Sequence, residues 1–208
     1  TGTQVAGVVN ISGVSRGAQI AGAANFAKSL NGFQLAGVIN SSDTIKGAQL
    51  SGLLNRANYL KGLQFGVVNV AETCSGIPIG LLSLVRRGGY LKLELYADEV
   101  FHANIAFRSG VRRFYNIFQA GVQPQQLVSD PVWTFGLGAG TSFRTSNKLY
   151  VDIDLMAQQV AKSSHLSEMN MLYKLGVDAD WQFAPKVSLS FGLTFNMYLT
   201  DTQSEHYD

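Results

Sequence analysis

Three histidines are the residues of this sequence best suited to bind a metal or to move a proton. His102 falls in an alternating run that predicts a strand, His165 in a polar loop, and His206 in the polar tail DTQSEHYD. None of them has partners at the spacing that a zinc site requires. We therefore expect no metal site and no cofactor.

The loop AKSSHLSEMN holds the one arrangement that suggests catalysis. His165 precedes Ser167 by two residues and Glu168 by three. This set resembles the His, Ser and Glu of outer-membrane lipid A deacylases, a likeness that implies a lipid-modifying barrel enzyme. Nucleophilic catalysis, however, needs a positioned base that a third group orients. Neighbouring residues of a polar loop supply no such orientation, so we expect no enzyme and keep this one as the second alternative.

Two pairs of aspartates lie two residues apart, in LYVDIDLMAQQ and in MLYKLGVDADWQF, and each pair shares one face of a strand. Four clustered carboxylates suit calcium binding or acid–base chemistry. The simpler interpretation is ion pairing with nearby cations inside a narrow barrel, which side chains fill. The candidate interior charges are Lys92, Glu94, Arg108, Asp152, Asp154, Lys174, Asp178 and Asp180.

The strands that must position these charges are the alternating runs from about residue 87 to 208. The clearest runs span about 10–13 residues, the length that crosses a bilayer when a strand is tilted. Aromatic residues gather at the run ends, as in the interfacial girdles of membrane proteins. They are Tyr90, Trp133, Phe143, Tyr150, Tyr173, Trp181, Phe183 and Tyr198. The pattern predicts an antiparallel outer-membrane-type β-barrel over residues 87–208.

Residues 1–86 form a sequence repeat and lack the long alternating runs of residues 87–208. GTQVAGVVNISGVSR, GAQIAGAANFAKSLN, GFQLAGVINSSDTIK and GAQLSGLLNRANYLK are followed by the shorter GLQFGVVNVAETCS and GIPIGLLSLV. A fixed period indicates stacked structural units, and two glycines per copy disfavour helix. One copy fits one turn of a narrow β-solenoid, which we favour. One antiparallel barrel strand per copy is the alternative.

The solenoid interpretation assigns each recurring position to a column. We expect an inner column of first apolar positions, Val5, Ile20, Leu35, Leu50, Phe65 and Ile79, and a second from the return strand, Leu30, Ile45, Leu60 and Cys74. The amides recur in two rows, Gln4, Gln19, Gln34, Gln49, Gln64 and Asn10, Asn25, Asn40, Asn55, Asn69. Such rows either bond one another in ladders or present a flat polar interaction face.

Composition favours a membrane over nucleic acid. Hydrophobic residues make up 46 % of the 208 residues and charged residues 14 %, against about 25 % in soluble domains. No run approaches the eighteen apolar residues of a membrane helix. Membrane strands that alternate apolar and polar residues explain a high apolar content without long apolar runs. A net charge of +2 gives no argument for a nucleic-acid partner.

The repeats, with GIPIGLLSLVRRGGYLKLELYADE and NIAFRSGVRRFYNIFQAGV after them, resemble the surface-repeat proteins of Bacteroidetes-type bacteria. The resemblance implies outer-membrane or surface placement and no activity. We therefore expect an all-β, non-enzymatic structural or interaction protein in the outer membrane of a Gram-negative bacterium. Its partners would be the lipid bilayer and other proteins of an envelope complex. The first alternative is a surface binding module that uses the Gln/Asn face.

Overall fold

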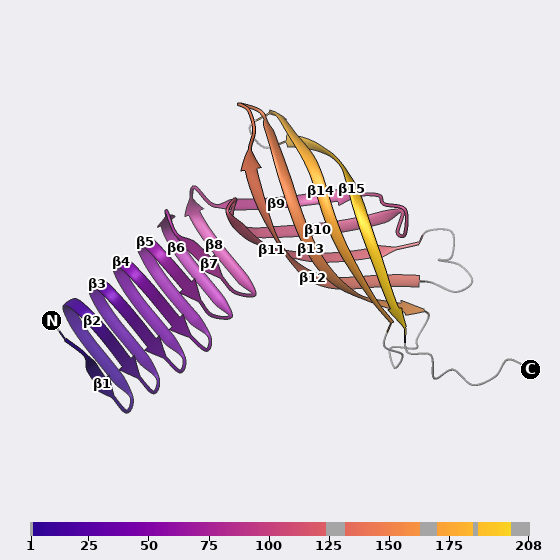
Figure 1. Ribbon diagram of the computed structural model, residues 1–208. Coiled ribbons are helices and arrows are strands. Elements are labelled where there is room, and N and C mark those ends of the chain that lie inside the picture. The colour runs from indigo at the N-terminus through magenta and orange to yellow at the C-terminus, as the bar shows by residue number, and fades with distance from the viewer. Residues whose placement is uncertain (1, 124–131, 163–169, 185–186, 201–208) are drawn as a thin grey trace, which may run out of the picture. The chain divides into compact units, whose positions relative to one another are not determined.

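A computed structural model describes residues 2–123, 132–162, 170–184 and 187–200, and all regular elements in these ranges are β-strands (Figure 1). The described part holds no helix long and apolar enough to cross a membrane. The first sheet comprises β1 (Gln4–Ala6), β2 (Val9–Ala21), β3 (Ala24–Ala36), β4 (Ile39–Ser51), β5 (Leu54–Phe65), β6 (Val68–Cys74), β7 (Ile77–Ile79) and β8 (Leu82–Arg87). The second comprises β9 (Tyr90–Tyr96), β10 (Ala103–Val111), β11 (Phe114–Val122), β12 (Val132–Arg144), β13 (Leu149–Lys162), β14 (Asn170–Ala184) and β15 (Val187–Thr200).

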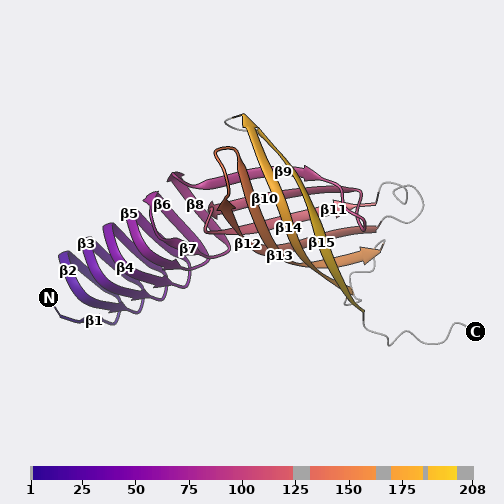
Figure 2. The ribbon, with the colours of Figure 1, turned by 45° about the horizontal axis from the view of Figure 1, so that its top comes forward.

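The first sheet is parallel, and its register follows the repeat of the sequence. Gln4 lies opposite Gln19, Gln19 opposite Gln34, and Gln34 opposite Gln49. Successive copies therefore lie side by side as coils that run in the same direction (Figure 2). The predicted β-solenoid is confirmed, and the alternative of one antiparallel strand per copy is wrong.

Two ladders of side-chain amides run inside the solenoid. Gln34 Nε2 donates to Gln19 Oε1 at 2.7 Å. The asparagines bond in the opposite direction along the stack, because Asn25 Nδ2 donates to Asn40 Oδ1 at 2.9 Å. The same nitrogen also donates to the Leu35 carbonyl at 2.8 Å. Neighbouring coils thus satisfy each other's amides, which allows polar side chains to occupy an interior position.

This burial agrees with the predicted amide ladders and not with the alternative of a flat polar interaction face. Gln4, in the first strand, is exposed, but the later members of both rows are buried. The buried members are Gln19, Gln34, Gln49, Gln64, Asn10, Asn25, Asn40, Asn55 and Asn69. A ligand cannot reach amides that lie inside the coil and bond one another. The structure therefore gives no support to a binding module that uses these residues.

The expected inner column of first apolar positions lies on the outside instead. Val5 is 73 % exposed, Phe65 56 % and Leu35 39 %. The physical reason is that the glutamines occupy the inward positions next to these apolar residues on the same strands. Gln34 and Ala36 point inward, so Leu35 between them points outward.

The return strand packs as the sequence predicts. Leu30, Ile45 and Leu60 are fully buried and form one cluster with Ala57 and Ala71. Cys74 is half-buried and packs against this cluster. The apolar core of the solenoid is therefore narrow and confined to one side of the coil.

The leading glycine of each copy forms a tight corner. Gly32 has a φ of +144°, and a Cβ there would lie 2.0 Å from the carbonyl oxygen of Gly17. Positive φ and close backbone approach both require glycine. The recurrence of this residue at the start of each copy is thus a steric demand of the stack.

The glutamine ladder ends where the repeat changes. Pro78 lies opposite Gln64, in the position that glutamine holds in the earlier copies. Proline has no side-chain amide, and Gln64 Oε1 has no hydrogen-bond donor among the described residues. Pro78 therefore terminates the row.

The second sheet is an antiparallel, curled half-barrel with the strand order β15-β14-β13-β12-β11-β10-β9 (Figure 1). β12 pairs with β13 from Val132 opposite Lys162 to Arg144 opposite Tyr150. β13 pairs with β14, and β14 with β15, in the same antiparallel manner. The predicted antiparallel barrel-type strands after the repeats are confirmed.

The two faces of this sheet differ sharply in polarity. Leu193 is 84 % exposed and Leu95 78 %, whereas Lys174 on the other face is 1 % exposed. One aromatic residue departs from the expected girdles. Tyr90 is buried and its ring lies 4.9 Å from that of Tyr115, centroid to centroid.

The chain divides into two compact units. The first comprises Thr1–Leu91 and Ser109–Asn116, and the second comprises Lys92–Arg108 and Ile117–Asp208. The solenoid belongs to the first unit, and the charged face of the half-barrel belongs almost wholly to the second.

Candidate functional site: the charged interior of the half-barrel

The inward face of the half-barrel alternates between long polar side chains and glycines. A Cβ at Gly136 would lie 2.7 Å from Gln158 Cγ, and one at Gly138 would lie 2.6 Å from Met156 Cγ. Glycines on β12 therefore leave the space that long side chains of β13 occupy. Side chains thus fill much of the interior, and a cavity of about 140 Å³ remains beside Glu94, Arg108 and Asp178.

The structure brings all eight expected interior charges to this face. Arg108, Asp152, Asp154, Lys174 and Asp180 are buried, and Lys92, Glu94 and Asp178 are partly buried. The alternation along each strand predicts this placement correctly, because successive side chains point to opposite faces.

Arg108 bridges two carboxylates of different strands. Its Nη2 lies 2.7 Å from Glu94 Oε2 on β9, and its Nε donates to the same oxygen at 2.9 Å. Its Nη1 lies 2.5 Å from Asp154 Oδ2 on β13. One guanidinium thus neutralises two acids through a planar fork of donors, a geometry that lysine cannot reproduce.

A second cluster surrounds Lys92. Its Nζ lies 3.2 Å from Glu94 Oε1 and 3.2 Å from Asp180 Oδ1. It also donates to Ser190 Oγ at 3.1 Å, and Ser190 Oγ donates to Asp180 Oδ1 at 3.0 Å. Because Glu94 also contacts Arg108, the two clusters form one continuous network.

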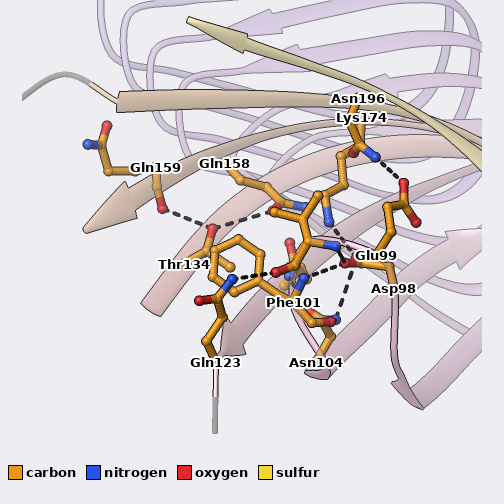
Figure 3. A network of polar contacts seen from close by, with 12 residues as sticks. Asp98, Glu99, Phe101, Asn104, Gln123, Thr134, Gln158, Gln159, Lys174 and Asn196 are labelled. Atoms are coloured by element: carbon orange, nitrogen blue, oxygen red, sulfur yellow. Dashed lines mark hydrogen bonds and ion pairs between the residues drawn. The ribbon is translucent and has the colours of Figure 1, made fainter. Parts of the chain in front are cut away.

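A third cluster lies around the segment between β9 and β10 (Figure 3). Lys174 Nζ forms an ion pair with Asp98 Oδ2 and lies 5.7 Å from the centroid of the Phe101 ring. Asp98 Oδ1 accepts hydrogen bonds from the backbone N–H groups of Val100 at 2.9 Å and Phe101 at 2.6 Å. Asn104 Nδ2 donates to the Phe101 carbonyl at 2.6 Å. These contacts hold the segment in one conformation with its acid over the buried lysine.

Sequence reasoning missed this third cluster except for Lys174. Asp98 lies in the turn-like stretch ADEV, and Asn104 and Gln119 bond one another at 2.9 Å across β10 and β11. The signal for Asn104 was present, since it shares the parity of Arg108 on the same strand. Asp98 carried no such signal, because a residue between strands has no periodicity.

The geometry shows charge neutralisation for four of the acids. Glu94, Asp98, Asp154 and Asp180 are each held by Arg108, Lys92 or Lys174. No group of three or more His, Cys, Asp or Glu among the described residues is placed to hold a metal ion. The network therefore neutralises Glu94, Asp98, Asp154 and Asp180 within the interior.

The remaining candidate residues lie elsewhere. His102 is exposed and lies in a bend just before β10, not in the expected strand, while His165 and His206 fall outside the described residues. Cys74 lies in the solenoid, where burial raises the pKa of its thiol and a hydrogen bond from the Gly76 backbone opposes that rise.

An apolar groove of about 850 Å³ lies on the outward face of the second unit. Leu95, Ile105, Ala120, Trp133 and Phe135 contribute to its lining. The small side chain of Ala120 lies between larger neighbours on adjacent strands, which produces the depression. Its lining is apolar like the rest of the outward face.

Comparison with protein-family models, with curated proteins and with solved structures finds no match to this chain.

Proposed function

We propose that the chain is a non-enzymatic structural or interaction component of the outer membrane of a Gram-negative bacterium, in which β9–β15 form a lipid-facing wall. The observation that supports the proposal is the inverted polarity of the half-barrel. Its charges lie on the concave face, and its apolar side chains lie on the outward face.

The outward apolar residues occur on strands from both ends of the sheet. They are Leu91, Leu93, Leu95, Ile105, Phe135, Leu137, Ile153, Leu155, Leu175, Val177, Leu189, Phe191, Leu193, Phe195 and Met197, each at least 39 % exposed. A soluble antiparallel sheet covers its apolar face and exposes its polar one. The opposite arrangement is typical of strands whose outward solvent is hydrocarbon.

Strand length agrees with this proposal. β12 spans 13 residues, β13 and β15 span 14, and β14 spans 15. A tilted strand needs about 9–11 residues to cross the hydrocarbon core. These four strands are therefore long enough to cross and to reach the interfaces.

The two edges of the sheet support a role in an assembly. Within the described residues, the strand order ends at β9 and at β15. Hydrocarbon offers no water to unpaired backbone groups, so in a bilayer both edges must pair. They pair with each other or with strands of another chain, and the second case makes the protein a subunit of an envelope complex. The resemblance of the repeats to surface-repeat proteins stays a prediction.

Fractionation and substitution at Leu193 test the proposal. The protein should sediment with membranes and require detergent for extraction. Leu193→Arg should lower the free energy of unfolding in lipid vesicles by about 2–4 kcal/mol, because a charge would face mid-bilayer lipid. The unfolding midpoint in urea, followed by tryptophan fluorescence, measures this loss.

Leu193→Met is the matched control and should leave the midpoint nearly unchanged, since it keeps an apolar side chain of similar volume. A wild-type protein that is monodisperse in plain buffer without detergent would contradict the proposal. So would a Leu193→Arg variant as stable in vesicles as Leu193→Met.

A further inference from the structure

Beside its apolar core, the solenoid has buried amides inside and apolar side chains outside. Three rows of apolar residues run along its outer surface. The first apolar row is Val5, Ile20, Leu35, Leu50, Phe65 and Ile79; the second is Val8, Ala23, Val38, Leu53, Val67 and Leu81; the third is Val9, Ala24, Ile39, Leu54, Val68 and Leu82. Every position in the three rows is apolar.

These side chains are accessible even in the middle of the stack. Leu35 is 39 % exposed, and Leu53, at the bend of a later coil, is 50 % exposed. Six coils at a spacing of roughly 4.8 Å make each apolar row about 24 Å long. Contiguous apolar surface of this kind marks an interaction site and is not needed by a solenoid whose core lies elsewhere.

Cations border this surface. Arg16, Lys46 and Lys61 follow one another in register, with Asn31 between the first two, and form a basic row four residues before the first apolar row. All three cationic side chains are exposed. A lysine or arginine at the edge of an apolar surface can lay its stem along that surface and keep its charge in the polar layer.

The net charge of the solenoid is positive. The sequence up to Arg87 contains seven lysines and arginines and two acids. Both acids already have partners, since Asp43 accepts a hydrogen bond from Asn58 and Glu72 pairs with Arg86 and Arg87. The basic row is therefore available to an anionic partner.

We infer that the three apolar rows of the solenoid lie against the surface of an anionic lipid bilayer, with Arg16, Lys46 and Lys61 at the level of the lipid head groups. An apolar strip bordered by cations is the feature by which amphipathic elements bind such an interface, through apolar burial and attraction to anionic lipids together. The inference concerns the solenoid alone and goes beyond the lipid-facing wall proposed for β9–β15.

Fluorescence quenching on the full chain tests the inference. In a Cys74→Ala background, single cysteines are introduced by Leu35→Cys on the first apolar row, Thr44→Cys outside the three apolar rows and Leu193→Cys on the half-barrel, and each is labelled with a fluorophore. The proteins are reconstituted in vesicles of phosphatidylcholine, with or without phosphatidylglycerol. Brominated lipid and aqueous acrylamide then report which probes lie in the bilayer.

The probe at position 35 should be quenched by brominated lipid at least threefold more in vesicles that contain phosphatidylglycerol than in phosphatidylcholine alone. The probe at position 44 should be quenched by acrylamide in both. Combined Arg16→Glu, Lys46→Glu and Lys61→Glu substitutions should abolish the lipid quenching at position 35 and leave that at position 193 unchanged.

Equal acrylamide quenching at positions 35 and 44 in anionic vesicles would overturn the inference, while lipid quenching at position 193 would keep the proposed function intact. Protection of position 35 from acrylamide without lipid quenching would also overturn it, because a protein surface such as a second copy would then cover the rows. Equal lipid quenching at position 35 in both vesicle types would overturn the role of the basic row. Loss of lipid quenching at position 193 alone would count against the proposed function and not against this inference.

Discussion

A side chain at Gly192 would place its Cβ 1.8 Å from the carboxylate oxygen Oδ1 of Asp178 on the adjacent strand. That Cβ would also lie 2.4 Å from the Val177 carbonyl oxygen, so Gly192→Ala should displace both the Asp178 side chain and the backbone of β14. Overpacking of this kind costs about 1–3 kcal/mol of the free energy of unfolding. Urea unfolding in detergent micelles measures the loss.

Gly176→Ala is the matched control on the same inward face. A Cβ there would lie 3.5 Å from Asp178 Oδ2, which is an ordinary contact distance. This variant should unfold at nearly the wild-type midpoint. Equal destabilisation by the two substitutions would show that glycine itself, and not the room it leaves for Asp178, is required.

Asn40 tests the amide ladder of the solenoid. Its Nδ2 donates to Asn55 Oδ1 at 3.1 Å and to the Leu50 carbonyl at 2.6 Å, and its own oxygen accepts from Asn25. Asn40→Ala leaves these buried partners unsatisfied, at about 1–3 kcal/mol for each lost group. We expect a large fall in the urea midpoint.

Asn58→Ala provides the comparison for this variant. Asn58 is exposed, and its side-chain Nδ2 donates to Asp43 Oδ1 at 2.9 Å on the surface. Its removal should change the midpoint little, because water replaces the lost bond. A similar effect at positions 40 and 58 would mean that the buried ladder does not stabilise the stack.

Arg108 tests the charged network. Arg108→Met removes the cation between Glu94 and Asp154 and leaves two acids without it in the interior. Breaking a buried ion pair from one side costs about 3–5 kcal/mol. Adding Glu94→Gln and Asp154→Asn should restore much of the stability, since the uncompensated charges are then removed.

Arg144→Met is the surface control for this series. Arg144 is exposed, and its hydrogen bonds run to the nearby Ser146 carbonyl and Asn147 side chain. Arg144→Met should change the free energy of unfolding by no more than about 0.5 kcal/mol, as other surface substitutions do. Failure of the triple variant to recover stability would indicate that Arg108 acts by packing and not by charge.

Cys74 predicts a pH dependence. Burial raises the pKa of its thiol above the ordinary value, with the Gly76 backbone N–H opposing the shift. Between the unfolded and folded pKa values, the unfolded thiol has lost its proton and the folded thiol has kept it. Stability contributed by the neutral thiol is therefore complete below the unfolded pKa and falls as the pH rises above it.

The comparison of wild type with Cys74→Ala isolates this effect. The urea midpoint of wild type should fall relative to that of the variant as the pH increases from 7 to 10. Parallel pH profiles of the two proteins would show that the thiol titrates alike in the folded and unfolded states.

The sequence allowed the stacking register and the inward charges to be predicted, because both depend on fixed spacing. Gln19 and Gln34 recur at the same position of successive copies. Their amides can bond one another only if the copies stack in a parallel register. The period of two along β13 places Asp152 and Asp154 together. Spacing of this kind can be read directly from the sequence.

The side of the coil that faces inward could not be predicted from hydrophobicity. Leu35 was expected inside because apolar side chains are usually buried, but Gln34 and Asn40 take the inward positions, where the adjacent coils satisfy them. Asp98 was missed for a different reason. It is placed by a local turn and by one distant lysine, Lys174, and neither leaves a periodic pattern in the sequence.

The opposed directions of the two amide ladders have a consequence for how such an array can evolve. Glutamine donates toward the preceding copy and asparagine toward the following one, as Gln34 and Asn25 do. The dipoles of the two rows therefore cancel, and a longer stack accumulates no electrostatic cost at its ends. Because each copy contacts its immediate neighbours, duplication or deletion of a fifteen-residue segment preserves every remaining register. Length is thus a trait that this architecture can change in single genetic steps.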